Sequence, residues 1–532
     1  MSDPTDDALG GRHESLWLAT ERGQTYAPLA ENVSVDVAVV GGGIVGIATA
    51  AKLAEAGRDV ALLERDRLAA KVTGHTTAKL TSLHGLAYGH LESKFGEETA
   101  RRYARANQAA IEDVAETADR LDVDCGFTRA TAYTYVADER WRRRVHQEVD
   151  VATRVGLPAS FVESPGLDEA ECAVAVSEQA HFHPRRYLLA LADTIPGEGS
   201  AVYEETTVTD VRDGDPCVVA TDRGTVRADD VVVATHFPID DHALFYSRLT
   251  PRRSYVVAAR LNEEPPAGLY YRSPDPHFSI RPTAEADLVL FGGQNHRTGA
   301  GEERDRYRRL EREVRDRFDV AAVAYRWSTQ DYVSVDGVPF VGPASPRADH
   351  VYVATGFGGW GMTNGVAAAT VLRDLITDRA SEWAEVFDPD RVKLRASASR
   401  LVSHNVHALK HLVSDRVERR PSMDASGLAP GEGEVFAVNG EKVAVARDGD
   451  GDLHAVSAIC SHKGCHVTWN DGEGSWDCPC HGSRFDVDGS VLDTPANDPL
   501  DPVTLDVEDL SAPSRAGDSG DAADRPGPGR RG

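Results

Sequence analysis

The sequence predicts an α/β protein followed by a small all-β domain, and three segments support this fold class. A buried strand from Val35 leads through a glycine turn into an apolar helix ending at Gly57, and a second strand follows at 59–64. This strand–helix–strand unit of about thirty residues is typical of a parallel sheet. A second strand, glycine turn and helix occupy 351–377. After Gly427 the chain changes to short alternating segments with Gly and Asp turns, which predict the all-β domain.

Five segments are expected along the 532 residues. A polar arm covers 1–32, and the first domain covers 33–395, with 86–155 predicted as helical and 200–345 as a run of short strands and turns. The last three segments are a charged helical connector at 396–425, the all-β domain at 426–510 and a tail at 511–532. The tail has almost no apolar residues, so we expect it to be disordered.

The charge of the chain excludes some classes of partner. Its 58 Lys and Arg face 85 Asp and Glu, a net charge of −27 at pH 7, which would repel a nucleic-acid backbone over most of the surface. No stretch reaches the ~18–20 apolar residues of a membrane span. The acidic start, MSDPTDDALGG, lacks the features of a signal peptide. We therefore expect a soluble, cytoplasmic protein that binds a small molecule.

Three glycines at the start of the first helix form a dinucleotide-binding fingerprint. Gly41, Gly43 and Gly46 satisfy G-x-G-x-x-G between a strand and a helix, and Glu64 ends the next strand. The glycines allow a tight turn, approach of a pyrophosphate and close packing of helix on strand, while an acid in this place accepts hydrogen bonds from a ribose. The alternative is a glycine-rich turn without a ligand.

Two later segments, 228–238 (ADDVVVATHFP) and 351–362 (VYVATGFGGWGM), resemble the strand-and-turn elements that close around the flavin in FAD-dependent oxidoreductases, which favours FAD over NAD. Residues 327–343 (WSTQDYVSVDGVPFVGP) are similar to the stretch that precedes the final flavin-binding helix in one such superfamily. With them, residues 33–390 resemble the D-amino-acid oxidase/glycine oxidase superfamily. The resemblance implies a Rossmann-like FAD-binding domain with an interleaved mixed-sheet substrate domain. It places further FAD contacts at Thr76, Thr77, Val208, Gly358, Gly359, Gly361 and Met362. Thr76 and Thr77 lie in TGHTTAKLT, which is otherwise an ordinary helix start. No second G-x-G-x-x-G follows on a strand–helix unit, which disfavours direct oxidation of NAD(P)H.

Four residues of the all-β domain form a candidate metal site. Cys460 and His462 stand as Cys-x-His, and Cys478 and His481 as Cys-x-x-His. Two thiolates and two imidazoles are the ligands of a Rieske [2Fe–2S] cluster. The alternative is a zinc site, whose usual spacings are Cys-x₂₋₄-Cys and His-x₃₋₅-His. Residues 427–510 resemble the Rieske proteins of cytochrome bc-type complexes.

The Rieske resemblance carries further expectations. It pairs Cys465 with Cys480 in a disulfide between the cluster loops, and it assigns to Ser483 a hydrogen bond to a bridging sulfide. High-potential members have Tyr where this chain has Phe485, which cannot donate a hydrogen bond. We therefore expect a potential below that of the respiratory proteins. The other cysteines, at 125, 172 and 217, lie in apolar surroundings and are expected in the core.

The substrate side is marked only weakly. Arg281 in FSIRPT resembles the arginine that amino-acid-oxidising relatives direct at a substrate carboxylate, although an internal salt bridge is the favoured alternative. His296 and the segment 181–189 (HFHPRRYLL) fall where the family builds its substrate face, but single histidines are more often structural.

Together these features predict an FAD-dependent dehydrogenase that takes electrons from an amine, amino acid or hydroxy acid. The electrons would pass through a Rieske cluster to an external carrier such as ferredoxin or a quinone-linked acceptor. The alternatives are a reductase fed through the cluster, a redox sensor or electron carrier without turnover, and a Rieske domain that serves only for docking.

A salt titration tests one inference from composition. Only 8 of the 58 basic residues are Lys, and acids are in large excess. Self-repulsion of that charge destabilises a compact chain unless salt screens it, so we expect an organism with molar cytoplasmic salt. A GC-rich genome would explain the Arg/Lys ratio but not the acids. The melting temperature should rise steeply with KCl up to about 1 M, and equal stability at low and molar salt would refute a halophilic origin.

Overall fold

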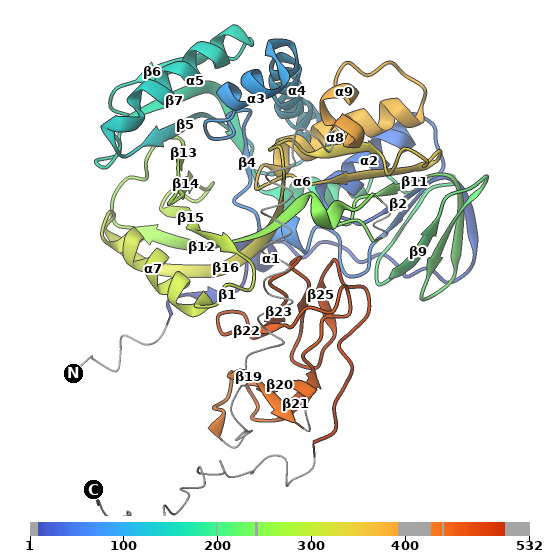
Figure 1. Cartoon of the computed structure of the whole chain (residues 1–532). Helices are drawn as coiled ribbons and strands as arrows, with labels where there is room; N and C mark the ends of the chain where they lie inside the picture. The colour runs from blue at the N-terminus through green and yellow to red at the C-terminus, as the bar shows by residue number, and fades with distance from the viewer. Residues whose placement is uncertain (1–8, 198, 240–242, 392–426, 439–440, 506–532) are drawn as a thin grey trace, which may run out of the picture.

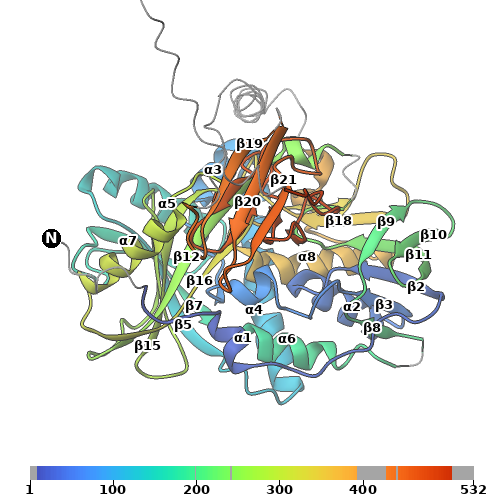
Figure 2. The same cartoon turned by 90° about the horizontal axis from the view of Figure 1, so that it is seen from below.

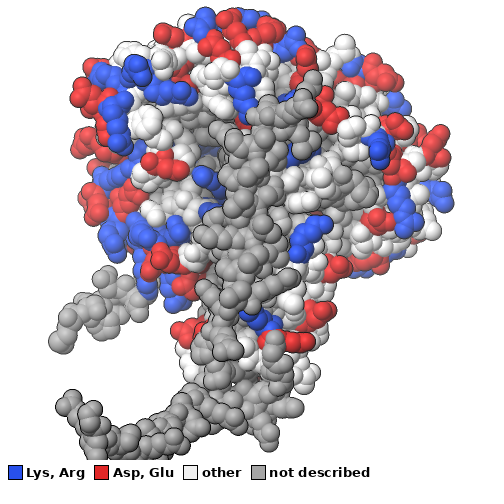
Figure 3. All heavy atoms as spheres, viewed as in Figure 1, with Lys and Arg blue, Asp and Glu red and all other residues white. Residues whose placement is uncertain are grey.

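The computed structural model describes residues 9–197, 199–239, 243–391, 427–438 and 441–505, and Figure 1 shows them as two large sheets with a smaller β domain beside them. The predicted connector at 396–425 and the predicted tail at 511–532 lie outside these ranges. Among the described residues, no helix has both the length and the hydropathy that crossing a bilayer requires. Figure 3 shows acidic and basic side chains interspersed over one face of the molecule.

The predicted strand–helix–strand unit lies in an eight-stranded sheet. The main strand order is β17-β18-β11-β2-β3-β8, and β10 and β9 extend from β11. In the parallel centre, Val37 of β2 pairs with Val60 of β3 and with Asp230 of β11. Helices α2 (Ile44–Glu55) and α8 (Gly361–Ile376) pack together beside this sheet. The strands are β2 (Val33–Val40), β3 (Val60–Leu63), β8 (Ala201–Tyr203), β9 (Val208–Arg212), β10 (Cys217–Thr221), β11 (Thr225–Val233), β17 (Phe340–Pro343) and β18 (Val351–Thr355).

A ten-stranded mixed sheet forms the second domain. Its main order is β1-β16-β12-β15-β14-β13-β5-β7-β4, and β6 pairs with β7. Its strands alternate along the chain with those of the first sheet, so the interleaved mixed-sheet domain is confirmed. The strands are β1 (Arg12–His13), β4 (Lys79–Leu80), β5 (Thr128–Val136), β6 (Ala159–Val162), β7 (Cys172–His181), β12 (Leu249–Leu261), β13 (Leu269–Arg272), β14 (Phe278–Pro282), β15 (Leu288–Arg297) and β16 (Val320–Ser334).

Two sequence predictions within this domain were incomplete. Residues 86–155 form three helices, α3 (Tyr88–Phe95), α4 (Glu97–Arg120) and α5 (Arg142–Arg154), but β5 interrupts them because its alternating side chains pair with β7. The strand-rich region 200–345 contains helix α7 (Glu303–Arg315). Its many charges hid a narrow apolar face of Tyr307, Leu310 and Val314, which is buried.

The described part of the predicted arm, residues 9–32, packs into the fold. Strand β1 pairs with the edge strand β16, and helix α1 (Leu16–Thr20) follows. Trp17 is buried, and its indole Nε1 donates a hydrogen bond to the Thr76 carbonyl at 2.7 Å. The arm therefore supports the loop in which FAD contacts are predicted.

The all-β domain consists of two small sheets around its own core. Strands β19 (Gly433–Val438), β20 (Glu441–Arg447) and β21 (Leu453–Ser457) form one sheet, and β22 (Thr468–Asn470), β23 (Ser475–Asp477), β24 (Arg484–Phe485) and β25 (Val491–Asp493) form the other. Figures 1 and 2 place the four-stranded sheet toward the two large sheets and the three-stranded sheet on the outside. The cluster loops therefore face the rest of the chain.

Candidate functional site

A cavity of about 620 Å³ lies where the two large sheets and the all-β domain meet. The glycine turn after β2, the loops after β3 and β11, and the turn before α8 supply one side of its lining. Strands β12 to β16 supply another side, and residues 490–499 of the all-β domain complete it. Ten of the eleven predicted FAD contacts line it: Gly41, Gly43, Glu64, Thr76, Thr77, Val208, Gly358, Gly359, Gly361 and Met362.

The glycine turn leaves no room for side chains. Gly41 has φ +107°, and a Cβ there would lie 2.6 Å from the Ala234 carbonyl oxygen. Gly46, the predicted contact that does not line the cavity, lies beneath the turn, where a Cβ would approach the Gly41 oxygen to 1.8 Å. Helix α2 follows its N-cap residue Gly43, which has no side chain to cap the helix, and Ile44 N donates a hydrogen bond to Thr73 Oγ1 at 3.1 Å. The turn therefore fits a pyrophosphate at the start of this helix.

Glu64 lies beside the turn with its carboxylate held by the backbone. Oε2 accepts a hydrogen bond from Gly42 N at 2.6 Å, and Oε1 accepts one from Asp66 N at 2.8 Å. Burial raises the pKa of Glu64, and the two amide donors oppose this shift. A carboxylate has about four acceptor positions, so two remain for a ribose diol.

At the opposite end of the cavity, Asp331 of β16 connects two of its walls. Its Oδ2 accepts a hydrogen bond from Gly359 N at 2.5 Å, in the turn before α8. Its Oδ1 lies 3.3 Å from Nε2 of His236, in the loop after β11. All three residues line the cavity, so this pair of contacts fixes the turn where the flavin ring is predicted.

The four candidate cluster ligands lie on two loops of the all-β domain. Cys460 and His462 follow β21, and Cys478 and His481 follow β23; the two imidazole rings are 5.0 Å apart. The hydrogen bond between the two thiols lowers the pKa of Cys460 to about 7 and raises the pKa of Cys478, so one proton is shared by the pair. Burial lowers the pKa of His462 to about 4, and its buried Nδ1 has no hydrogen-bond partner among the described residues. A deprotonated thiolate and a neutral imidazole are the forms that bind iron.

The spacing of these ligands disfavours a single zinc ion. Within the described chain, no three of the four have donor atoms within 4.8 Å of one another, although ligands about 2.0–2.3 Å from one zinc ion must lie that close. The cysteines that do meet this distance are Cys465, Cys478 and Cys480, and Cys465 is bonded to Cys480 with S–S at 2.11 Å. The donor set fits a binuclear cluster better.

Side chains of the ten-stranded sheet bind the backbone of the second cluster loop. Tyr332 Oη donates a hydrogen bond to the His481 carbonyl at 3.1 Å, and Gln330 Nε2 donates one to the Gly482 carbonyl at 2.8 Å. Arg297 Nη2 donates one to the Cys480 carbonyl at 3.0 Å. The loop that carries two of the candidate ligands is therefore fixed against this sheet.

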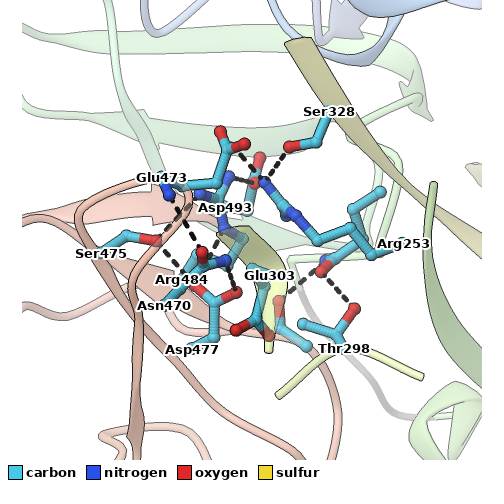
Figure 4. Close-up of polar contacts among 12 residues, drawn as sticks. Arg253, Thr298, Glu303, Ser328, Asn470, Glu473, Ser475, Asp477, Arg484 and Asp493 are labelled. Carbon is cyan, nitrogen blue, oxygen red and sulfur yellow. Dashed lines mark hydrogen bonds and ion pairs between the residues drawn. The ribbon is translucent and has the colours of Figure 1, made fainter. Parts of the chain in front are cut away.

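A buried charge network joins the two domains (Figure 4). Arg253, which is 1% exposed, lies 3.4 Å from Glu473 of the all-β domain, and Tyr307 donates to the same carboxylate at 2.8 Å. Burial would raise the pKa of Glu473, but the positive charge of Arg253 lowers it overall. Next to this pair, Arg484 binds Asp493 at 2.9 Å within the all-β domain.

Comparisons with known proteins agree with this geometry. Residues 36–375 match the DAO family, described as FAD dependent oxidoreductase, and residues 419–505 match the Rieske [2Fe-2S] domain. The chain belongs to the DAO family and carries a Rieske domain. FAD and a [2Fe–2S] cluster are therefore its cofactors.

Three similar proteins illustrate the arrangement. YhfW of Bacillus subtilis (strain 168), named as a Rieske 2Fe-2S iron-sulfur protein, is 36% identical over 93% of this chain and 98% of its own length. Gamma-glutamylputrescine oxidoreductase of Escherichia coli (strain K12) is 26% identical over 70% of this chain and 91% of its own. The crystal structure of glycine oxidase from Geobacillus kaustophilus shares the fold, with a TM-score of 0.57 at 19% identity, covering 68% of this chain and all of that one.

The weak substrate candidates of this DAO-family chain lie outside the cavity lining. Arg281 is buried against the Trp17 ring at 5.0 Å and donates to the Phe182 carbonyl. It forms no ion pair with any described residue, so the internal salt bridge expected for it is not found. His296 lies 3.0 Å from Tyr255 Oη, and burial lowers its pKa to about 3. His183, in the segment 181–189, caps helix α6 (Pro184–Ala192).

Lys79 of β4 lines the cavity together with Tyr271 and Ser279. No sequence motif assigned Lys79 a role of its own. Its Nζ donates to the Tyr270 carbonyl at 2.7 Å and to Ser279 Oγ at 2.5 Å. Burial, with a smaller contribution from the charge of Arg281, lowers the pKa of Lys79 to about 7. Its place in TGHTTAKLT, the segment expected to line the cofactor, was the available signal, but only the folded sheet shows that its side chain reaches the cavity.

A substitution tests the expected cluster potential. Phe485 is fully buried in the same apolar cluster as Cys460 and Cys478. Phe485→Tyr should raise the midpoint potential by about 60 mV, the equivalent of one hydrogen bond of about 1.4 kcal/mol to a charged sulfur. EPR-monitored redox titration measures this shift, with Phe485→Leu as the control without a donor. An unchanged potential in Phe485→Tyr would show that the missing hydroxyl does not set the potential.

Proposed function

We propose that the protein is a dehydrogenase that passes electrons from a small organic substrate through FAD and its Rieske cluster to an external carrier such as ferredoxin or a quinone-linked acceptor. FAD, when bound, accepts a hydride from a carbon bearing an amine or a hydroxyl, and the cluster carries electrons onward singly. Two relatives are named for an amine and an amino acid, gamma-glutamylputrescine and glycine. Their names support nitrogen-bearing substrates here.

One observation carries the proposed relay: a single layer of aromatic side chains separates the cavity from the candidate cluster ligands. His236 lines the cavity and lies 4.7 Å from the ring of Tyr332, whose hydroxyl donates to the His481 carbonyl. Phe237, the next residue, has its ring 6.2 Å from that of His462. Electron transfer slows steeply with distance, so this short separation favours a direct path from flavin to cluster.

Lys79 supports a substrate that carries a carboxylate. An ammonium has three donors, and the bonds to Tyr270 and Ser279 use two of them, leaving one for a ligand. No described carboxylate forms an ion pair with Lys79, so an anionic ligand would compensate a charge that is otherwise costly to bury. The Tyr271 ring lies 5.9 Å from Nζ and 5.0 Å from Trp360, beside the turn predicted to meet the flavin ring. Amino acids and hydroxy acids fit this position better than simple amines.

Substitution of Lys79 tests the substrate class. Lys79→Met should raise the KM for amino or hydroxy acids at least tenfold, about 1.4 kcal/mol, and should change the KM for amines that lack a carboxylate little. Since the pKa of Lys79 is about 7, wild-type affinity for a carboxylate should fall as pH rises above 7, and Lys79→Arg should lose this dependence. Lys52→Met is the matched control, because Lys52 pairs with Asp113 and does not line the cavity. Equal KM values in Lys79→Met and wild type would refute the role.

The direction of electron flow is tested by anaerobic reduction in high salt. Amines, amino acids and hydroxy acids are added in turn, and flavin absorbance and the Rieske EPR signal are recorded together. Bleaching by one class followed by the EPR signal is the expected result. If only reduced ferredoxin produces both changes, the protein is a reductase fed through the cluster. No change with any donor or acceptor favours a sensor or carrier.

A ligand variant separates relay from docking. In His462→Ser, substrate should still bleach the flavin, but reduction of a one-electron carrier should fall at least a hundredfold because no cluster accepts the electrons. Thr468→Ser on the neighbouring strand serves as the control. Carrier reduction at the wild-type rate in a cluster-free His462→Ser protein would show that the Rieske domain serves docking alone.

A further inference from the structure

One segment of the Rieske domain crosses the mouth of the FAD cavity. This strap, residues 490–499, begins at the turn before β25 and continues beyond it. Val491, Thr494, Asn497 and Pro499 are among its residues that line the cavity. The FAD site of this chain is therefore completed by a domain other than the one that carries the dinucleotide fingerprint.

The strap is attached on both sides of the glycine turn. On one side, Arg65, after β3, donates a hydrogen bond from Nη2 to the Leu492 carbonyl at 3.0 Å. On the other side, after β11, Asn497 Nδ2 donates to the Ile239 carbonyl at 3.2 Å, and Thr494 Oγ1 donates to the Thr235 carbonyl at 3.5 Å. Strand β2, which leads into the glycine turn, lies between β3 and β11 in the sheet. The strap thus spans the opening above the turn that receives the pyrophosphate.

Two acidic residues of the strap, Asp493 and Asp498, line the cavity that would receive a phosphate-bearing ligand. Asp493 would repel a pyrophosphate if its charge were uncompensated, but Arg484 binds it at 2.9 Å. Asp498 is exposed, so solvent and salt screen its charge. Tyr332 Oη lies 2.8 Å from the Thr494 carbonyl oxygen and 3.1 Å from the His481 carbonyl oxygen, so its single O–H proton is shared between the two acceptors. One hydroxyl therefore joins the strap to the cluster loop, so the two parts dock together.

We propose that the strap closes the FAD cavity, so that FAD binding and docking of the Rieske domain stabilise each other and FAD leaves only after the domain undocks. Linkage makes this coupling reciprocal: whatever weakens docking must weaken FAD binding by the same factor. The proposal concerns retention of the cofactor, and it holds for either direction of electron flow.

The rate of FAD release tests the proposal on the full-length holoprotein. Two variants weaken docking without altering the cavity lining: Arg297→Met removes donors to the cluster loop, and Gly472→Leu places a side chain where a Cβ would already lie 3.0 Å from Glu303 Cβ. Release is followed by the fluorescence of free FAD after dilution. Both variants should release FAD at least tenfold faster than wild type. Arg260→Met is the matched control, because Arg260 pairs with Glu285 and Asp287, outside the docking surface.

Hydrogen exchange supplies a readout that does not depend on turnover. Amides of the strap should exchange at least tenfold faster in the FAD-free wild-type protein than in the holoprotein, whereas amides of the three-stranded sheet β19–β21 should not change. If the strap amides of a variant exchange faster while the amides of β2 and α2 stay protected, the Rieske domain has undocked and the chain has not unfolded. Unchanged FAD release in such a variant overturns the proposal. Equal exchange of the strap amides in the wild-type protein with and without FAD also overturns the proposal. This second result decides the question even if neither variant undocks the Rieske domain.

Discussion

The position of the Rieske domain depends on a buried ion pair between two domains. Arg253 comes from the ten-stranded sheet and its side chain is 1% exposed, while Glu473 comes from the Rieske domain and its side chain is 13% exposed, so both charges are largely removed from solvent. Removing one partner of such a pair typically costs about 3–5 kcal/mol because the other charge stays buried and unpaired. The pair therefore specifies one docked arrangement. Tyr307 donates a hydrogen bond to the same carboxylate and so further restricts the orientation of Glu473.

That arrangement determines how the two cofactor sites face each other. With Glu473 held, the second cluster loop meets Gln330 and Tyr332 of the adjacent strand, and the strap reaches the loops around the glycine turn. The same contacts therefore hold the second cluster loop beside the ten-stranded sheet and place the strap in the lining of the FAD cavity. Deleting the whole domain would disturb both effects at once, so point substitutions distinguish them better.

Local motifs made much of the site predictable. The glycine turn and the Cys-x-His and Cys-x-x-His pairs are short motifs. The residues that bind the cofactor in each motif lie within a few positions of one another in the sequence, so the sequence alone identifies them. Contacts such as that of Tyr332 with the His481 carbonyl join segments far apart in the chain, and no local pattern signals them. Helix α7 was missed for a related reason, since its charged residues conceal an apolar face that only the sheet beneath it defines.

On the substrate side of the cavity, resemblance in sequence is a weaker guide to the role of a residue than it is at the glycine turn. The sequence resemblance predicted that Arg281 meets a substrate carboxylate, but Trp17 from the N-terminal arm lies against its guanidinium. Lys79, from a different strand, reaches the cavity instead, and the nearby charge of Arg281 contributes to its lowered pKa.

The contacts between flavin cavity and cluster do not by themselves favour either direction of electron flow. Direction depends on the potentials of the substrate, the two cofactors and the carrier. In the proposed relay, a cluster that lacks the tyrosine hydroxyl near its sulfurs would be a weaker oxidant of the flavin, so the step between the two cofactors would be less strongly downhill. The potential of the external carrier would then decide the net flow. Under this proposal, the fused cluster adapts an oxidase-like flavin domain to one-electron partners.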